Sequence, residues 1–141
     1  MNVKIADIMA KRVITAARHY TVDQVRSMME RNRIGAIPIV DADNIPLGII
    51  TSTDLSRPRL KDHTPISRIM SDEVKAIPAY NDVSAAARAM RRGKIHHLVV
   101  THEKQVVGLI SSYDLLKLVE DHRFTMKKAP VQKKKSKRTR K

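Results

Sequence analysis

The chain has 141 residues, of which 42% are hydrophobic and 3% aromatic, and its formal net charge is +14. The length suits one domain or two small ones that share a core, and the hydrophobic fraction is ordinary for a globular protein. The absence of Cys excludes disulfides, thiolate catalysis and Cys-based zinc sites. Because no apolar run approaches the ~18 residues of a membrane span and the first residues lack the apolar region of a secretory signal, we expect a soluble cytoplasmic protein without membrane contact.

The first part of the chain predicts a β-α-β-β-α unit. Residues 13–15 form a short β-like run, and Thr21 with Gln24 has the spacing of a capping box, which predicts a helix start. Apolar residues then recur on one helical face. The apolar runs 36–40 and 47–50 predict two strands joined by a polar turn, and a short helix follows them. One such unit buries too little surface to be comfortable alone.

The second part of the chain repeats the first. A shift of 61 residues maps apolar positions onto apolar positions, so that Ile5, Val22, Met29 and Ile34 recur as Ile66, Val83, Met90 and Ile95. After the polar turn the shift becomes 60, and Gly48 recurs as Gly108. The same order of elements is therefore predicted, with strands at 74–77, 95–100 and 106–110, a helix at about 82–92 and a last helix through Val119.

One motif occurs in both repeats, in the runs 48–55 and 108–115. Each run is an apolar strand that begins at Gly, ends in hydroxyl residues and continues into a helix, with Asp54 or Asp114 three residues after the first hydroxyl. Such a pattern is typical of plain N-capping by Ser or Thr, with Asp in the first turn. It also offers free backbone N–H groups to an anion and a carboxylate that can accept two hydrogen bonds from a vicinal diol such as a ribose. The duplication favours this second interpretation.

These residues resemble the CBS (cystathionine β-synthase) domain, present as a tandem pair that is often called a Bateman module. The resemblance covers roughly residues 3–122 and rests on both Gly motifs and on the paired runs 5–9 with 66–70 and 34–40 with 95–100. It implies an α/β fold of two β-α-β-β-α repeats that pack by pseudo-twofold symmetry through their sheets. The expected division is repeat 1 at 1–58, a linker at 59–65, repeat 2 at 66–122 and a basic tail at 123–141.

The resemblance also implies a ligand that bears adenosine, namely AMP, ADP, ATP or an S-adenosylmethionine relative. In the family the Asp holds the ribose hydroxyls, and each site joins the Asp motif of one repeat to the first and middle strands of the other. One expected site comprises Thr51, Thr53, Asp54, Ala76, Ile77, His96, His97 and Val99. The other expected site comprises Ser111, Asp114, Thr15, Gly35, Ala36 and Pro38.

The two expected sites are unequal. Tyr113 stands where the first repeat has a second Thr, and His96 and His97 stand where it has Gly and Ala. Because imidazolium groups donate hydrogen bonds to phosphate, we predict that a nucleotide phosphate prefers the Asp54 site. Adjacent strand residues face opposite ways, so the two imidazoles are not expected to chelate one metal ion. The alternative to a phosphate contact is one partly buried ring and one surface ring.

No paired carboxylates, Ser/His/Asp set or Gly-rich phosphate loop occurs at a recognisable spacing, so the chain is not expected to be an enzyme and needs no catalytic cofactor. The expected function is that of a sensor or regulatory module, whose ligand favours one arrangement of the protein over another. The resemblance implies a flat homodimer, in which the interface transmits the ligand signal. A module that scaffolds a partner and binds no ligand is the other alternative.

Residues 126–141 carry nine Lys or Arg and no acid, which leaves only +5 of the net charge of +14 for the rest of the chain. Their low apolar content predicts disorder. This tail is interpreted either as a solubilising extension or as a non-specific binder of RNA or DNA phosphates, through Lys133, Lys134, Lys135, Lys137, Arg138, Arg140 and Lys141. Without aromatic residues it cannot stack on bases. The alternative function is thus a nucleic-acid-associated protein whose CBS pair serves as a dimerisation scaffold.

Overall fold

The computed structural model describes residues 2–122, so the predictions for the basic tail lie outside the described residues. The first half contains α1 (Ile5–Ile8), β1 (Ala16–Ala17), α2 (Val22–Asn32), β2 (Ala36–Val40), β3 (Pro46–Thr51) and α3 (Ser52–Leu55). The second half contains the 3-10 turn η1 (Ile66–Arg68), β4 (Ala76–Pro78), α4 (Val83–Gly93), β5 (His97–His102), β6 (Gln105–Ser111) and α5 (Ser112–Asp121).

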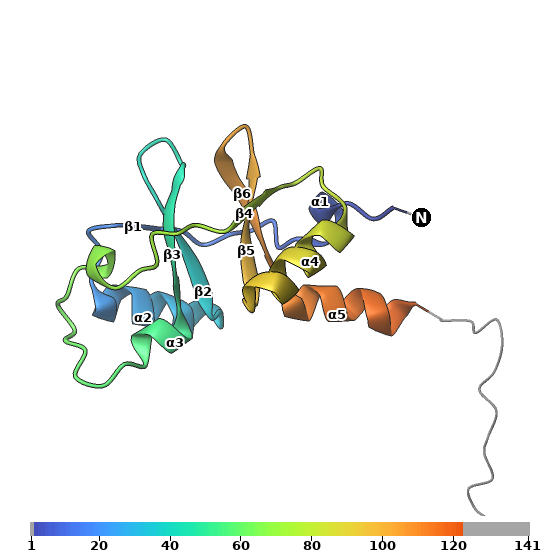
Figure 1. The fold of residues 1–141 in the computed structure, drawn as a ribbon. Helices are drawn as coiled ribbons and strands as arrows, with labels where there is room; N and C mark the ends of the chain where they lie inside the picture. The colour runs from blue at the N-terminus through green and yellow to red at the C-terminus, as the bar shows by residue number, and fades with distance from the viewer. Residues whose placement is uncertain (1, 123–141) are drawn as a thin grey trace, which may run out of the picture.

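The strands form two three-stranded sheets with the same topology, β1-β2-β3 and β4-β5-β6. In each sheet the first strand is parallel to the middle strand, and the middle strand pairs with the third as an antiparallel hairpin. The two hairpins stand next to each other, with α2 and α3 below the first sheet and α4 and α5 below the second (Figure 1). This arrangement confirms the predicted α/β fold of two β-α-β-β-α repeats.

The capping chemistry read from the sequence explains where α2 begins. The hydroxyl of Thr21 accepts a hydrogen bond from the Gln24 amide at 3.2 Å, and the Gln24 side chain accepts one from the Thr21 amide at 2.9 Å. The helix buries one face and ends at Arg33, whose left-handed φ of 54° is matched by Lys94 at the end of α4. Within residues 2–122, no helix is both long and apolar enough to cross a membrane.

The first strand of each repeat begins later than the sequence predicts. The apolar run 13–15 precedes β1, and the run 74–77 overlaps β4 only in its second half. Ahead of these runs, the chain pairs with the other repeat. Ala10 makes an antiparallel bridge to Leu109 of β6, and Ser71 makes one to Ile49 of β3. We call residues 9–15 and 70–75 the crossing segments.

The hydrophobic cores are crossed in the same way. Ile5 of α1 is fully buried in the core of the second repeat, with Ile77, Leu98 and Ile110. Its counterpart, Ile66 of η1, is fully buried in the core of the first repeat. Each repeat therefore closes its core with the leading turn of the other, and neither core is complete without the second repeat.

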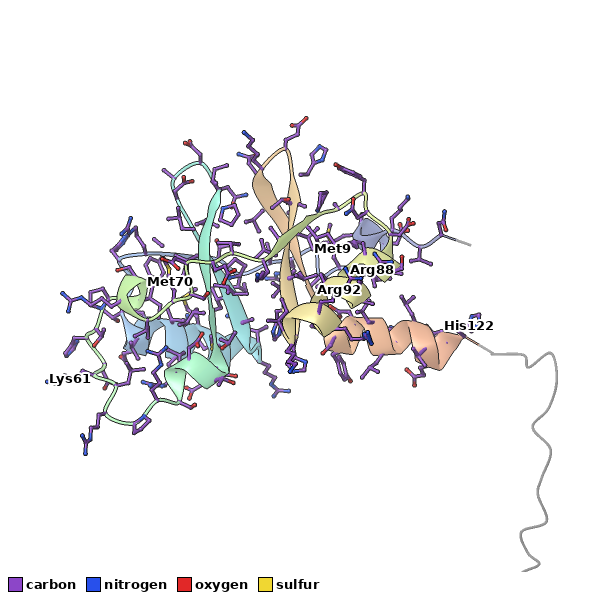
Figure 2. The ribbon with its side chains drawn as sticks, in the orientation of Figure 1. Met9, Lys61, Met70, Arg88, Arg92 and His122 are labelled. Carbon is purple, nitrogen blue, oxygen red and sulfur yellow. The ribbon has the colours of Figure 1, made fainter. Side chains whose placement is uncertain are left out.

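The Gly that opens each motif is required by this crossing. A Cβ on Gly48 would lie 2.5 Å from the backbone oxygen of Ser71, and one on Gly108 would lie 2.9 Å from the backbone oxygen of Ala10. The side chains of Met70 and Met9, both labelled in Figure 2, would also lie within 3.0 Å of those Cβ atoms. Only a residue without a side chain lets the crossing segment lie directly on the strand.

Candidate functional site

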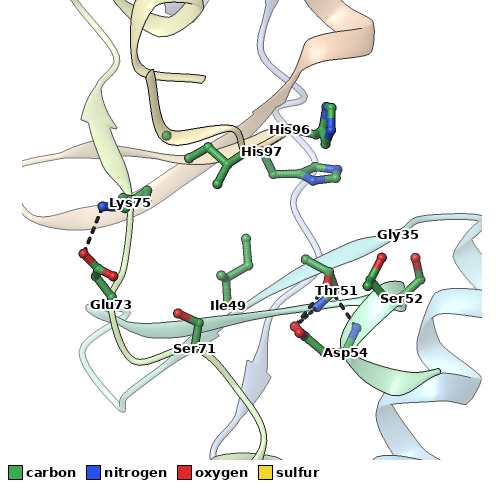
Figure 3. A pocket seen from close by; sticks show the side chains of 13 residues that line it. Gly35, Ile49, Thr51, Ser52, Asp54, Ser71, Glu73, Lys75, His96 and His97 are labelled. Carbon is green, nitrogen blue, oxygen red and sulfur yellow. Dashed lines mark hydrogen bonds and ion pairs between the residues drawn. The ribbon is translucent and has the colours of Figure 1, made fainter. Parts of the chain in front are cut away.

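A cavity of about 510 Å³ lies between the two repeats, within the range of small-molecule sites (Figure 3). The first repeat and its hairpin contribute Gly35, Ile49, Thr51, Ser52, Thr53 and Asp54. The second crossing segment contributes Ser71, Glu73 and Lys75, and the end of α4, the loop after it and the start of β5 contribute Gly93, Ile95, His96 and His97. Four separate stretches of the chain therefore meet at this one hollow.

The Asp54 carboxylate is held at the start of α3 by a capping box. Its Oδ2 accepts hydrogen bonds from the Thr51 amide at 2.9 Å and from the Thr51 hydroxyl at 3.0 Å. The Asp54 amide donates in turn to the Thr51 hydroxyl oxygen at 3.3 Å. Among the described residues, no protein group donates to Oδ1 of Asp54. The predicted capping interaction is thus present, and it leaves Oδ1 of Asp54 available to a ligand.

The second crossing segment supplies the charged wall of the cavity. Ser71 and Ile49 exchange two backbone hydrogen bonds of 3.1 Å, which fix the segment on β3. Every second residue from Ser71 then lines the cavity, as expected for extended chain. Lys75 Nζ lies 3.0 Å from Glu73 Oε2, and both side chains are solvent-exposed. An exposed pair of this kind is weak, so a ligand anion can compete for the ammonium group.

His96 and His97 both line the cavity, and His96 is exposed whereas His97 is half-buried. The alternation rule does not apply because β5 begins at His97 and His96 lies in the loop before it. The His96 ring nitrogen Nδ1 is 3.3 Å from the hydroxyl oxygen of Ser112. Within residues 2–122, no group of three or more His, Asp or Glu side chains could hold a metal ion.

Burial lowers the pKa of His97, the nearby His96 lowers it further, and the carboxylate of Asp114 partly opposes both effects. The ring is therefore predominantly neutral at pH 7, and it can both donate and accept a hydrogen bond. A phosphate next to it would favour the protonated form, because an opposite charge raises a histidine pKa.

Of the first expected site, the structure gathers five residues around the cavity: Thr51, Thr53, Asp54, His96 and His97. The other three lie elsewhere. Ile77 is in the core of the second repeat, Val99 is fully buried in β5, and Ala76 faces a smaller hollow beside α4. Sequence reasoning missed Glu73 and Lys75. The alternation of side chains in the extended run before β4 is the signal that could have found them.

The residues of the second expected site are more scattered. Ser111 and Asp114 form a capping box like that of the first repeat, with bonds of 2.9, 3.1 and 3.2 Å. Gly35 lines the cavity at Asp54, whereas Thr15 lines a different hollow beside Val40. Ala36 and Pro38 are buried in β2.

Comparison with known proteins identifies the fold. The CBS domain family matches residues 5–60 and again residues 66–121. The solved CBS domain pair of protein MJ0100, in complex with 5'-methylthioadenosine and S-adenosyl-L-methionine, is 26% identical. It covers 85% of this chain and 98% of its own, with a TM-score of 0.80. CBS domain-containing protein YhcV of Bacillus subtilis is 25% identical over 115 residues, which cover 79% of this chain and 81% of YhcV.

Enzymes are also among the relatives. The inosine-5'-monophosphate dehydrogenase of Halobacterium salinarum is 37% identical over 111 residues, covering 75% of this chain and 22% of the enzyme. The homoserine O-acetyltransferase of Methanosalsum zhilinae is 30% identical over 125 residues, covering 88% of this chain and 25% of the enzyme. The chain thus spans about a quarter of the length of these enzymes. It belongs to the CBS domain family, with two CBS domains in tandem.

Proposed function

We propose that the chain is a regulatory sensor module that binds an adenosine-bearing ligand in the cavity between its two CBS repeats. The observation that carries the proposal is the free Oδ1 of Asp54, a residue that lines a cavity walled by groups of the other repeat. The complex of MJ0100 with two adenosine-bearing ligands supports this ligand class. The site residues that we assign are Thr51, Thr53, Asp54, Lys75, His96 and His97.

In this proposal the ribose lies against α3. Oδ1 of Asp54 accepts hydrogen bonds from the two ribose hydroxyls, while Oδ2 continues to hold the helix start. The base lies between aliphatic side chains, because Ile49 and Ile95 line the cavity and no Phe, Tyr or Trp of residues 2–122 does. The ligand thereby bridges the repeats, since its sugar contacts one and its remaining parts contact the other.

The phosphate of AMP, ADP or ATP fits the wall formed by Lys75, His96 and His97, which carries the cationic and imidazole groups of the cavity. A phosphate there replaces Glu73 as the partner of the Lys75 ammonium group. S-adenosylmethionine has a carboxylate that can use the same wall, although its sulfonium is unfavourable beside a cation. We therefore expect the nucleotide to bind more tightly than S-adenosylmethionine.

Binding without catalysis is the activity that we assign to this cavity. Oδ2 of Asp54 is engaged by two donors of Thr51, so protonation of that oxygen would weaken the start of α3. A carboxylate used in this way is suited to hold a sugar rather than to exchange protons.

The signal would pass to a second copy of the chain through α5. Tyr113, Leu116 and Val119 are 80%, 61% and 54% exposed, and α5 has no buried residue. An apolar helix face of this kind is typical of an interface, and the family resemblance implies a homodimer. Sedimentation equilibrium tests this part of the proposal, because Leu116→Asp should convert a dimer to a monomer.

Thermal unfolding with AMP, ATP, 5'-methylthioadenosine and S-adenosylmethionine tests the ligand class. A ligand at about 100 times its Kd adds about 2.7 kcal/mol to the free energy of unfolding. We expect AMP or ATP to stabilise the protein most, and mass spectrometry of the denatured, purified protein to detect any nucleotide that stays bound. Stabilisation by none of the four would contradict the proposal and favour a scaffold or nucleic-acid-associated protein.

A further inference from the structure

Helix α4 carries a concentrated positive charge that the fold leaves without partners. Arg88, Arg91, Arg92 and Lys94, its C-cap residue, are all exposed, and α4 contains no Asp or Glu. Within residues 2–122, none of these four side chains takes part in an ion pair or hydrogen bond. We call these four residues the α4 basic face.

The ordinary explanation for such charges is stabilisation of the helix C-terminus, where cations interact favourably with the helix dipole. The first repeat provides the control, because the shift of 61 residues aligns α4 with α2. The four positions correspond there to Ser27, Glu30, Arg31 and Arg33. Both helices end in the same left-handed cap, and both have cations in the last turn.

Stabilisation of a helix C-terminus, which both helices require, therefore does not explain the extra positive charge of α4. Arg88 lies in the middle of the helix, beyond the range of the terminal dipole effect, and Arg91 replaces a carboxylate. In α2, by contrast, Arg26 is paired with Asp62 at 3.2 Å. Within residues 2–122, α2 also leaves Arg31 and Arg33 without ion pairs, but it carries the acids Asp23 and Glu30, whereas α4 has four unpaired cations and no acid.

The geometry of the α4 basic face suits an extended anion. Arg88, Arg91 and Arg92 are spaced at i, i+3 and i+4, so they project on one side of the helix. Figure 2 labels Arg88 and Arg92 on α4. This side is opposite Ala86 and Met90, which are buried. Arg92 also borders a hollow of about 430 Å³ that Lys75 lines, so the positive surface continues from α4 to the second crossing segment.

We propose that the α4 basic face binds the phosphate backbone of a nucleic acid. Three of the four cations are Arg, whose planar fork matches phosphate oxygens in a bidentate manner. The large exposed apolar side chains of the described chain, Tyr80, Tyr113, Leu116 and Val119, all lie outside α4. The helix thus lacks the apolar face that a membrane-bound helix needs and the aromatic rings that would stack on bases. Binding is accordingly independent of base sequence.

The test uses the full chain, fluorescence anisotropy and a labelled duplex DNA and single-stranded RNA of arbitrary sequence, over a salt series from about 50 to about 200 mM. The test variant is the triple change Arg88→Gln, Arg91→Gln and Arg92→Gln. Gln is a good helix former, so α4 should persist, and circular dichroism checks this. The matched control removes the same charge from an exposed loop, by Arg57→Gln, Arg59→Gln and Lys61→Gln.

Each phosphate contact contributes about 0.9 to the slope of log K against log salt for duplex DNA. We expect the α4 triple variant to lose about 2 to 3 from that slope and at least about tenfold in affinity at low salt, for both nucleic acids. The loop variant should retain most of both quantities. Residues 126–141 are unchanged in either variant, so their contribution cancels in the comparison.

Equal losses in the two triple variants, or no loss in either, would overturn the proposal. Two further probes identify the wrong class of partner. If polyglutamate, or vesicles that contain phosphatidylserine, bind more tightly than the nucleic acids and depend more strongly on the α4 basic face, the partner is an acidic protein or a membrane, and the proposal is also overturned.

Discussion

The two aspartate motifs are nearly identical in local structure and different in their surroundings. In both, the carboxylate Oδ2 accepts a bond of 2.9 Å from the amide three residues before it and a second bond from the hydroxyl of that residue. Asp54, however, borders a cavity walled by Lys75, His96 and His97, whereas the positions equivalent to these three are Ile14, Gly35 and Ala36. The motif fixes a carboxylate, and the residues that the other repeat brings to it decide what it can bind.

The largest expected effect comes from mutations in the two crossed hydrophobic cores, which test whether each repeat depends on the other. Ile66→Ala should lower the free energy of unfolding by about 2–5 kcal/mol, because it leaves a cavity in a fully buried site. Although Ile66 follows the first repeat in sequence, its loss should reduce amide protection in β2 and β3 before β5 and β6. Ile5→Ala should give the opposite pattern. Hydrogen exchange measured by mass spectrometry checks both variants, and equal loss of protection across both repeats would contradict the crossing.

The two motif glycines should separate stability from ligand binding. Gly48→Ala and Gly108→Ala each place a Cβ against backbone of a crossing segment, and each should cost about 1–3 kcal/mol of stability. Only Gly48→Ala displaces the segment that bears Glu73 and Lys75, so only this variant should also weaken AMP binding severalfold. Urea unfolding and calorimetric titration measure the two quantities. An equal loss of AMP affinity in Gly108→Ala would mean that the cavity is not the binding site.

The smallest expected effect is a dependence of stability and AMP affinity on pH, caused by His97. Its folded-state pKa is lowered, so below the ordinary pKa of 6.5 the unfolded chain takes up a proton more readily and the protein loses stability. The loss of stability from about pH 7.5 to about pH 5.5 should be smaller in His97→Gln than in the unmodified chain. The affinity for AMP should rise severalfold over the same range, because phosphate favours the charged ring, and the affinity for adenosine should not. A flat AMP profile in the unmodified chain would argue against phosphate contact with His97.

Much of the fold could be predicted because the sequence contains two copies of the same structural repeat. The shift from Ile5 to Ile66 and from Gly48 to Gly108 aligns the repeats, and capping pairs such as Thr21 with Gln24 locate helix starts. The exchange of Ile5 and Ile66 between the two cores could not be predicted. The repeat shows that these two residues are equivalent, but it does not indicate in which core each one packs.

Part of the predicted site lies away from the cavity for the same reason. Ala76 and Ile77 were assigned because the family resemblance implies a contact with the first strand of the other repeat, whereas Ile77 lies in the core and Ala76 faces another hollow. The cavity is lined instead by Glu73 and Lys75, because their segment pairs with β3 of the other repeat. The sequence places His96 inside a strand, whereas β5 begins one residue later, at His97.

Titration of AMP into Asp54→Asn and Asp114→Asn, followed by calorimetry, tests the central claim most directly. The Asn amide oxygen can still accept the capping bonds, so each variant should fold, while its NH₂ group replaces the carboxylate oxygen that would receive the ribose diol. Hydrogen bonds to a charged group are worth about 1.5–3 kcal/mol each, so Asp54→Asn should bind AMP at least about tenfold more weakly, with Asp114→Asn close to the unmodified chain. Unchanged affinity in Asp54→Asn, together with lost binding in Asp114→Asn, would contradict the account.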